Sequence, residues 1–162
     1  GMSAQSPLEG YSGMPCVDEQ GNLLFSCRWD IIDHNYIPSM QMNILQGRNF
    51  FATDGADKAI VNERYVEMRG WEDSPIGKII YDGSGQRFEI VGVVADFRML
   101  STGVVEPIVM HTVPYVSDMA PEYNAVVLYN ILLDEVNAGN VTALEEAVSS
   151  VNDVYFKHNL VN

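Results

Sequence analysis

The sequence is poor in basic residues, in cysteine and in long apolar runs. Of 162 residues, nine are Lys or Arg against 22 Asp or Glu, which gives a formal net charge of −13. A surface this acidic repels phosphate backbones and anionic lipid head groups, so nucleic acid is a poor candidate ligand and a cationic or neutral partner fits better. The apolar runs at 90–94 and 125–129 are strand-sized, well short of the roughly 18–20 residues of a membrane helix. We therefore expect the polypeptide to be soluble as written.

Two cysteines, Cys16 and Cys27, are too few for a disulfide framework and lack the C-x-x-C spacing of a zinc or redox site. Two alternatives remain. The cysteines are joined if the compartment oxidises, or they stay as two thiols, buried or free, and the second alternative is the one we favour.

The composition is otherwise that of a globular chain, with 47% hydrophobic and 19% charged residues. The length suits one domain or two small lobes. Gly1 ahead of Met2 is not a natural initiation, so we interpret residues 1–2 as a cloning remnant and expect the chain to be a fragment of a larger protein.

Strand and helix patterns mix along the chain without strict βαβ alternation, which favours an α+β fold with mixed or antiparallel sheets. Glycine, proline and serine punctuate residues 3–21 and predict an extended arm or loop. Strands are predicted at 23–33, 42–50, 59–61, 107–113 and 124–133, with a hairpin at 74–97, a helical turn at 34–40 and a loop at 101–103. An apolar stripe at spacings of three and four predicts a helix over 141–155, and Thr142 with Glu145 matches a capping box.

The clearest local unit is the helix after residues 59–61. Asn62 is a good N-cap, Glu63 lies where the helix dipole favours an acid, and Gly70 suits the left-handed residue that ends a helix. Trp71 is then expected to fold back on the last turn. In the hairpin, we expect Phe88, Ile90 and Val94 to lie on one face of the second strand.

No motif predicts catalysis, a cofactor or a metal. His34, His111 and His158 lie far apart and outside zinc-binding patterns, and the glycines of 83–85 suit a hairpin turn better than a phosphate loop. The acid pairs Glu63 with Glu67 and Asp54 with Asp57 favour a solvated acidic face over calcium or glycosidase chemistry. A further set suits core packing better than an adaptable groove or a ligand platform: Met40, Met42, Met68, Met99, Met110, Met119, Trp29 and Trp71. We therefore assign no catalytic, cofactor-binding or metal-binding residue and leave substrate- and partner-binding residues unassigned.

Several segments taken in order, DHNYIPSM, LQGRNF, AIVNERYVEMRGWEDSPIGKII, FEIVGVVADF and EPIVM, resemble the extracytoplasmic domain of MacB/FtsX-like ABC transporter permeases, particularly the Bacteroides type. Ser74 departs from the usual aspartate, and the match after Val113 is only generic. The matching residues are Asp33, Tyr36, Gly47, Arg48, Phe50, Val61, Asn62, Glu63, Gly70, Trp71, Pro75, Ile76, Gly77, Lys78, Val91, Gly92, Val93, Val94, Asp96, Phe97, Glu106 and Pro107. Each of these also has a structural explanation, such as a cap, a turn, or at Gly92 a bulge or close approach, and we expect Arg48 to pair with Asp96 or Glu106.

The resemblance implies a two-lobed fold, a porter-like α/β lobe with a smaller β-rich lobe inserted into it. On that expectation residues 3–46 are the arm and first part of the porter-like lobe. Residues 47–113 are the inserted lobe, and residues 114–162 return to the porter-like lobe with the C-terminal helix.

The function that the resemblance implies is a non-catalytic domain on the periplasmic side of the bacterial inner membrane. It would couple cytoplasmic ATP hydrolysis to the handling of peptides, lipoproteins or drugs. The implied partners are a second permease subunit, a cytoplasmic ATP-binding subunit reached through membrane helices, and a periplasmic adaptor or lipoprotein. The alternatives are a secreted hydrolase with a carboxylate pair about 5–10 Å apart across a cleft and a stand-alone extracellular ligand-binding module.

Overall fold

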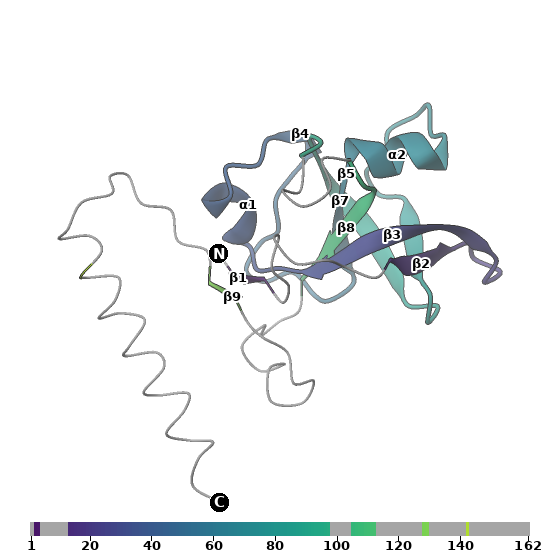
Figure 1. Cartoon of the computed structure of the whole chain (residues 1–162), viewed down its shortest axis with the longest axis horizontal. Coiled ribbons are helices and arrows are strands. Elements are labelled where there is room, and N and C mark those ends of the chain that lie inside the picture. The colour runs from purple at the N-terminus through teal and green to yellow at the C-terminus, as the bar shows by residue number, and fades with distance from the viewer. Residues whose placement is uncertain (1, 4–12, 98–104, 113–127, 130–141, 143–162) are drawn as a thin grey trace, which may run out of the picture. The chain divides into compact units, whose positions relative to one another are not determined.

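The structure is a computed structural model that describes residues 2–3, 13–97, 105–112, 128–129 and 142 (Figure 1). The chain divides into two compact units, Gly1–Asn130 and Ile131–Asn162, and the strands and helices described below belong to the first. The predictions for residues 101–103, for most of 124–133, for the helix over 141–155 with Glu145, and for Met99, Met119 and His158 lie outside the described residues.

Nine strands and two short helices follow one another in the described residues, so the prediction of an α+β fold with a mixed sheet is confirmed. None of the helices in these ranges is long and apolar enough to cross a membrane. The elements are β1 Met2–Ser3, β2 Met14–Val17, β3 Leu23–Ile31, α1 Tyr36–Ser39, β4 Ile44–Gly47, β5 Lys58–Asn62, α2 Glu63–Arg69, β6 Ile79–Asp82, β7 Arg87–Val94, β8 Ile108–His111 and β9 Leu128–Tyr129. The prediction that residues 3–21 are all arm or loop is wrong, because β2 lies within them.

Seven strands form one sheet in the order β4-β7-β5-β8-β3-β2-β6, and β1 pairs separately with β9. The pairs β3–β8 and β5–β7 are parallel and the other pairs are antiparallel. Because β6 pairs with β7 as well as with β2, the six strands other than β4 close into a ring. The sheet takes strands from both sides of the expected boundary at 46/47, and the division into lobes stays a prediction.

Strand β7 changes its antiparallel neighbour along its length. Its first residues pair with β6, where Phe88 lies opposite Ile80. Its last residues pair with β4, where Val94 lies opposite Ile44. β4 therefore extends from the ring beside the end of β7, and this arrangement forms one wall of the candidate site described below.

Two apolar clusters cover the two faces of this sheet. Every strand of the ring contributes to the first, which places it inside; its members are Cys16, Cys27, Trp29, Ala59, Val61, Tyr65, Ile80, Phe88, Ile90, Val93 and Val109. The second lies outside the ring, where α1 supplies Tyr36 and Ile37; its other members are Ile32, Phe50, Ile60, Val91, Val94, Ile108 and Met110. α1 thus packs its apolar residues on the outer face.

A bulge in β7 overturns one prediction. Ala59 of β5 lies opposite Ile90, but the next residue, Ile60, lies opposite Gly92, so Val91 is an extra residue. An extra residue reverses the alternation of side chains along a strand. Phe88 and Ile90 therefore point into the ring, whereas Val94 belongs to the outer cluster, and the expectation that all three share a face is wrong for Val94.

Gly92 lies at this bulge for a steric reason. A Cβ there would collide with the carbonyl oxygen of Arg48, so only glycine permits the approach of the two backbones. The expectation of a bulge or close approach at Gly92 is confirmed, and both are present.

The two cysteines form a disulfide, Cys16–Cys27, which corrects our preference for thiols. They lie on the paired strands β2 and β3 with their Cα atoms 6.5 Å apart, and both are completely buried in the inner cluster. The pairing follows from strand register, since Cys27 lies opposite Met14, two residues from Cys16. Spacing along the sequence does not contain this information.

Candidate functional site

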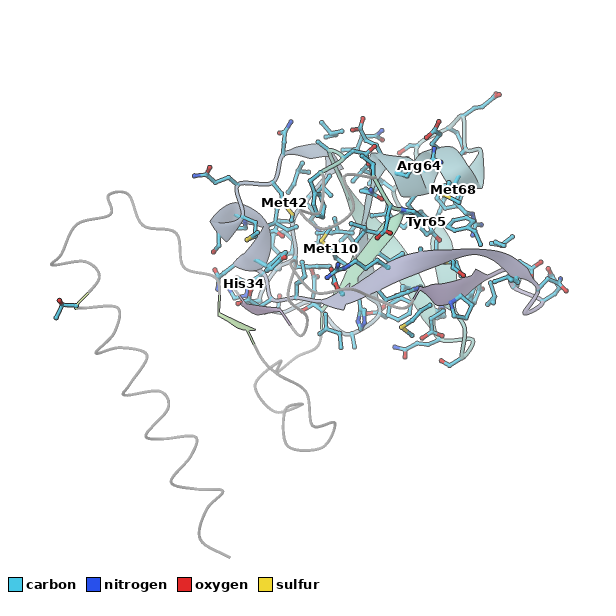
Figure 2. All side chains as sticks on the ribbon, in the orientation of Figure 1. His34, Met42, Arg64, Tyr65, Met68 and Met110 are labelled. Carbon is cyan, nitrogen blue, oxygen red and sulfur yellow. A yellow bond between two sulfur atoms is a disulfide. The ribbon has the colours of Figure 1, made fainter. Side chains whose placement is uncertain are left out.

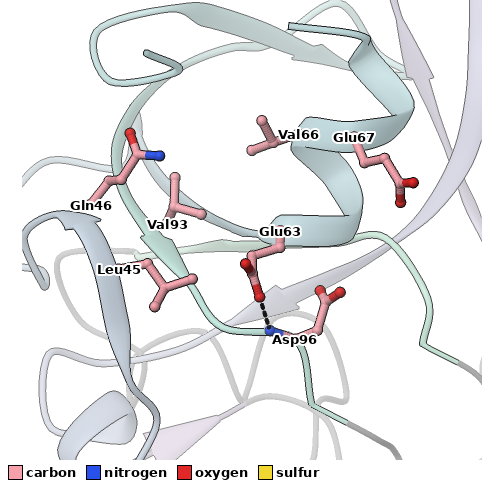
Figure 3. Close-up of a pocket in the computed structure, with 7 residues that line it drawn as sticks. All are labelled: Leu45, Gln46, Glu63, Val66, Glu67, Val93 and Asp96. Atoms are coloured by element: carbon pink, nitrogen blue, oxygen red, sulfur yellow. Dashed lines mark hydrogen bonds between the residues drawn. The ribbon is translucent and has the colours of Figure 1, made fainter. Parts of the chain in front are cut away.

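A groove of about 450 Å³ lies between β4 and α2 (Figure 3). Leu45 and Val66 form its apolar walls, with Val93 of β7 between them. Three exposed acids, Glu63 and Glu67 of α2 and Asp96 after β7, also line it, together with Gln46 of β4. The groove therefore combines apolar side chains with carboxylates.

Residues next to α2 in the sequence fix the two ends of this helix, which forms one wall of the groove. The side-chain oxygen of Asn62 accepts a hydrogen bond from Tyr65 N at 3.1 Å, and Gly70 ends the helix with φ 63°. Trp71 folds back, so that its ring lies 6.3 Å from that of Tyr65 and 4.6 Å from the guanidinium of Arg69. The predictions of the cap, the helix end and the position of Trp71 are confirmed.

Asn62 also joins three segments of the chain behind the groove. Its completely buried side chain accepts from Ile108 N at 2.9 Å and donates to the carbonyl oxygen of Glu106 and to Asp96 Oδ1, both at 2.8 Å. With the bond from Tyr65, the amide makes four hydrogen bonds. Asn62 therefore holds the start of α2, the end of β7 and the start of β8 in register.

A reciprocal pair of bonds fixes two of the carboxylates. Asp96 Oδ1 accepts from Arg64 N at 2.9 Å, and Glu63 Oε2 accepts from Asp96 N at 3.1 Å, the dashed contact in Figure 3. Glu67 is paired with Arg64. These bonds position the acids and leave their side chains exposed to solvent.

The predicted partner of Arg48 is wrong. Arg48 pairs with Asp54, at 2.6 and 3.1 Å, and with neither Asp96 nor Glu106. Asp54 is six residues away and is held in place by Phe51 N at 2.9 Å, so the loop itself supplies the partner. The hydrogen bond from Arg48 holds the pKa of Asp54 below its ordinary value, with a further contribution from Phe51 N.

Of the two acid pairs noted in the sequence, one stays together in the structure and the other does not. Glu63 and Glu67 line the groove together, as their spacing on a helix implies. Asp54 and Asp57 have different partners, because Asp57 contacts Lys58 at 3.1 Å. Within the described ranges, no group of three or more His, Cys, Asp or Glu side chains could hold a metal ion.

The remaining residues singled out in the sequence have structural surroundings. The turn at 83–85 is built on Asp82, whose Oδ1 accepts from Ser84 N and Gln86 N, both at 2.9 Å. His111 packs against Phe88 and Trp29, with ring centroids 5.0 and 6.1 Å away, and burial lowers its pKa. The carbonyl oxygen of His34 accepts a hydrogen bond from the side chain of Asn49 at 2.7 Å.

The methionines divide between core and surface (Figure 2). Met110 is completely buried in the outer cluster, whereas Met68 is 38% exposed. Met40 and Met42 pack against the outer cluster and also line a second groove of about 390 Å³ beside Phe97. Core packing and groove lining are thus both found among them.

Sequence reasoning missed the groove. Glu63 and Asp96 were noted for other reasons, and Leu45, Val66 and Val93 were not singled out as a set. The one available signal was the amide at Asn62 before an acidic first turn, which identified α2 but not the strand that faces it. The groove depends on β4 pairing with β7, and that pairing is not visible in the local pattern.

The fold is that of the extracytoplasmic domains of ABC-type permeases. The periplasmic region of MacB from Actinobacillus actinomycetemcomitans matches with a TM-score of 0.62 and 17% identity, over 95% of this chain and 66% of that one. The extracellular domain of the noncanonic ABC-type transporter YknZ from Gram-positive bacteria matches with a TM-score of 0.58 and 17% identity, over 89% of this chain and 72% of that one. A permease-protein domain from Porphyromonas gingivalis matches with a TM-score of 0.63 and 15% identity, over 94% and 67%.

The chain spans 66–72% of the length of these three structures. No protein-family model and no curated protein matches the sequence. The likeness is one of fold.

Proposed function

We propose that this chain is a non-catalytic extracytoplasmic domain of an ABC-type permease of the MacB/FtsX-like kind, in the Bacteroides version. The observation that carries the proposal is the likeness to the MacB periplasmic region over 95% of the chain. The order of the sequence motifs, through G-R-x-F, the Asn62 helix and the strand ending at Phe97, supports it independently.

In this proposal the domain transmits movement from the membrane helices to the periplasm. Membrane helices in the full-length protein connect it to a cytoplasmic ATP-binding subunit, and two copies move relative to each other on the periplasmic side of the inner membrane. Two carboxylates of the groove make hydrogen bonds that stabilise the fold. Asp96 accepts from the backbone N–H of Arg64 in α2, and Glu63 accepts from the backbone N–H of Asp96. Those bonds suit a domain that transmits movement and binds a peptide, lipoprotein or drug, or an adaptor protein.

The location is tested by thiol labelling of the full-length protein. Both cysteines of the chain are joined, so a Leu23→Cys variant presents one unpaired thiol in it, at a position that is 66% exposed. We expect a membrane-impermeant maleimide to label this variant in intact spheroplasts more strongly than the parent protein, whose two cysteines in this chain are joined to each other. Labelling only after the membrane is opened would place the domain on the cytoplasmic side and contradict the proposal.

The coupling is tested with the same thiol. A spin label at position 23 in each of two copies reports the distance between them when the ATPase subunit is present. We expect that distance to change on addition of ATP and to stay constant with an ATPase subunit that cannot hydrolyse it. A distance that does not change with ATP, or a domain that is monomeric in the complete transporter, would refute the proposed coupling.

A further inference from the structure

The strand β4 has one unpaired edge. In the part of the chain that the structure describes, β4 pairs with β7 and with no other strand, whereas each strand of the ring has neighbours on both sides. An unpaired edge offers backbone N–H and C=O groups to any extended segment that comes alongside. The sequence of β4, Ile44 to Gly47, contains neither the lysine nor the proline with which proteins often block such edges.

The side chains beside this edge are apolar and accessible. Leu45 is 44% exposed, although it lies in a strand, and Ile76, which lies against Gly47 at the end of β4, is 37% exposed. The groove begins at Leu45 and continues over Val93 to Val66. A partner lying along β4 would thus have apolar surface next to its backbone.

The far end of the groove is negative. The carboxylates of Glu63, Glu67 and Asp96 line it, and all three residues are exposed. Lysine and arginine side chains match such a surface, because their methylene stems cover apolar residues while the charged group stays at a polar rim. In an extended segment every second side chain points to the same side, so alternate basic residues would reach the groove.

We propose that β4 and the adjoining groove bind a basic, extended segment of a partner protein, which adds a strand to the sheet and places alternate lysine or arginine side chains over Leu45, towards the three carboxylates. This proposal goes beyond the function proposed above and holds for the chain by itself. The occupant is argued from charge: a second copy would bring another net charge of −13 to the same edge, and only two of the nine basic residues, Arg98 and Lys157, lie outside the described residues.

The test uses a short fluorescein-labelled peptide that alternates valine and lysine, with binding to the 162-residue chain followed by fluorescence polarisation. A peptide alternating valine and glutamate is the control for charge, and the lysine peptide N-methylated on its strand-pairing amides is the control for strand addition. We expect the lysine peptide alone to bind, and to protect from hydrogen exchange those amides of Ile44–Gly47 that face away from β7. Equal binding of the N-methylated peptide would overturn the use of the edge, and equal binding of the glutamate peptide would overturn the use of charge.

Matched variants locate the site. Glu67→Gln should weaken binding about three- to fivefold, whereas Glu19→Gln, which removes the same charge from the exposed turn between β2 and β3, should not change it. Leu45→Ser should weaken it about tenfold, whereas Leu23→Ser, at a more exposed leucine, should have no effect. Circular dichroism confirms that each variant is folded. Equal effects of Glu67→Gln and Glu19→Gln would mean attraction to the acidic surface at large and would refute the site.

Analytical sedimentation tests whether a second copy of the chain occupies the edge of β4 instead. If the chain dimerises and Leu45→Lys abolishes the dimer, the edge belongs to a second copy and the proposal is wrong. A monomer that binds the lysine peptide supports it.

Discussion

Replacement of Asn62 by alanine should destabilise the fold far more than an ordinary helix-cap substitution. The side chain is completely buried and makes four hydrogen bonds, to Tyr65 N, Ile108 N, Glu106 O and Asp96 Oδ1. A hydrogen bond contributes about 1 kcal/mol net, so Asn62→Ala should lower the free energy of unfolding by about 3–4 kcal/mol. A cap that bonds only its own helix would account for about 1 kcal/mol of this.

Urea unfolding followed by the fluorescence of the two tryptophans, of which Trp29 is buried, measures the change. The matched control is Asn35→Ala, at the N-cap of α1, because Asn35 is exposed and makes no side-chain capping bond. The control should change stability by less than about 0.5 kcal/mol. If the two variants unfold at the same urea concentration, Asn62 does not join the three segments and the reasoning is wrong.

A second substitution at position 62 tests whether the donor groups of the amide matter as well as the size of the side chain. Asn62→Asp keeps the shape, but it places a carboxylate oxygen against the Glu106 carbonyl oxygen and Asp96 Oδ1, to which the amide donated. Burial and these acceptors should raise the pKa of the new aspartic acid in the folded state. The stability of the variant is therefore retained below the unfolded pKa of about 3.9 and is lost as pH rises through the folded pKa. The variant should therefore approach the parent in stability near pH 4 and lose most near pH 7. A difference independent of pH would contradict this.

Three further predictions concern the ring. Replacing Cys16 and Cys27 by alanine opens a loop with a sequence separation of 11 and should lower stability by about 3 kcal/mol, measured as a melting temperature lower by about 6–12 °C. Dithiothreitol should lower the melting temperature of the parent by a similar amount and leave that of the variant unchanged. If the variant and the parent melt at the same temperature, the disulfide contributes nothing to stability. Gly92→Ala should destabilise by about 1–3 kcal/mol in urea, because the new methyl group collides with the Arg48 carbonyl oxygen; an unchanged midpoint would mean that the backbones are not in contact. Burial lowers the pKa of His111, with smaller opposing effects of Thr112 and Asp82, so stability should be full above the unfolded value of about 6.5 and fall as pH drops through the folded pKa. His111→Phe, which keeps the ring contacts, should flatten that part of the pH profile, and identical profiles would refute the assignment.

Part of the fold could be predicted because its causes lie within a few residues. The α2 unit is an example: Asn62 bonds the helix three residues later, Gly70 takes a left-handed conformation that other residues avoid, and Trp71 contacts the turn just before it. The β6–β7 hairpin is another, since Asp82 bonds the backbone of its own turn. The positions of β3, β4, β5 and β8 followed in the same way from alternation and turn residues, whereas β2 was missed.

The candidate site could be predicted only in fragments. Glu63 and Glu67 share a helix face at their spacing, and that much is local. Their distance from Leu45 depends on a strand that joins the sheet beside β7, and nothing in the sequence around 44–47 identifies that neighbour. Arg48 shows the same limit, because Asp54, Asp96 and Glu106 were all chemically suitable partners and the path of the loop decided among them.

The sequence by itself determined the acidic charge, the α+β class, the caps of α2 and the turn between β6 and β7, because each depends on composition or on contacts within one turn of chain. The tertiary structure alone decided the closure of the ring, the Cys16–Cys27 bond, the face on which Val94 lies and the groove between β4 and α2. These features depend on strand order and on one extra residue at Val91. Pairing between distant strands is chosen by the burial of the whole apolar set, and no local segment carries that choice.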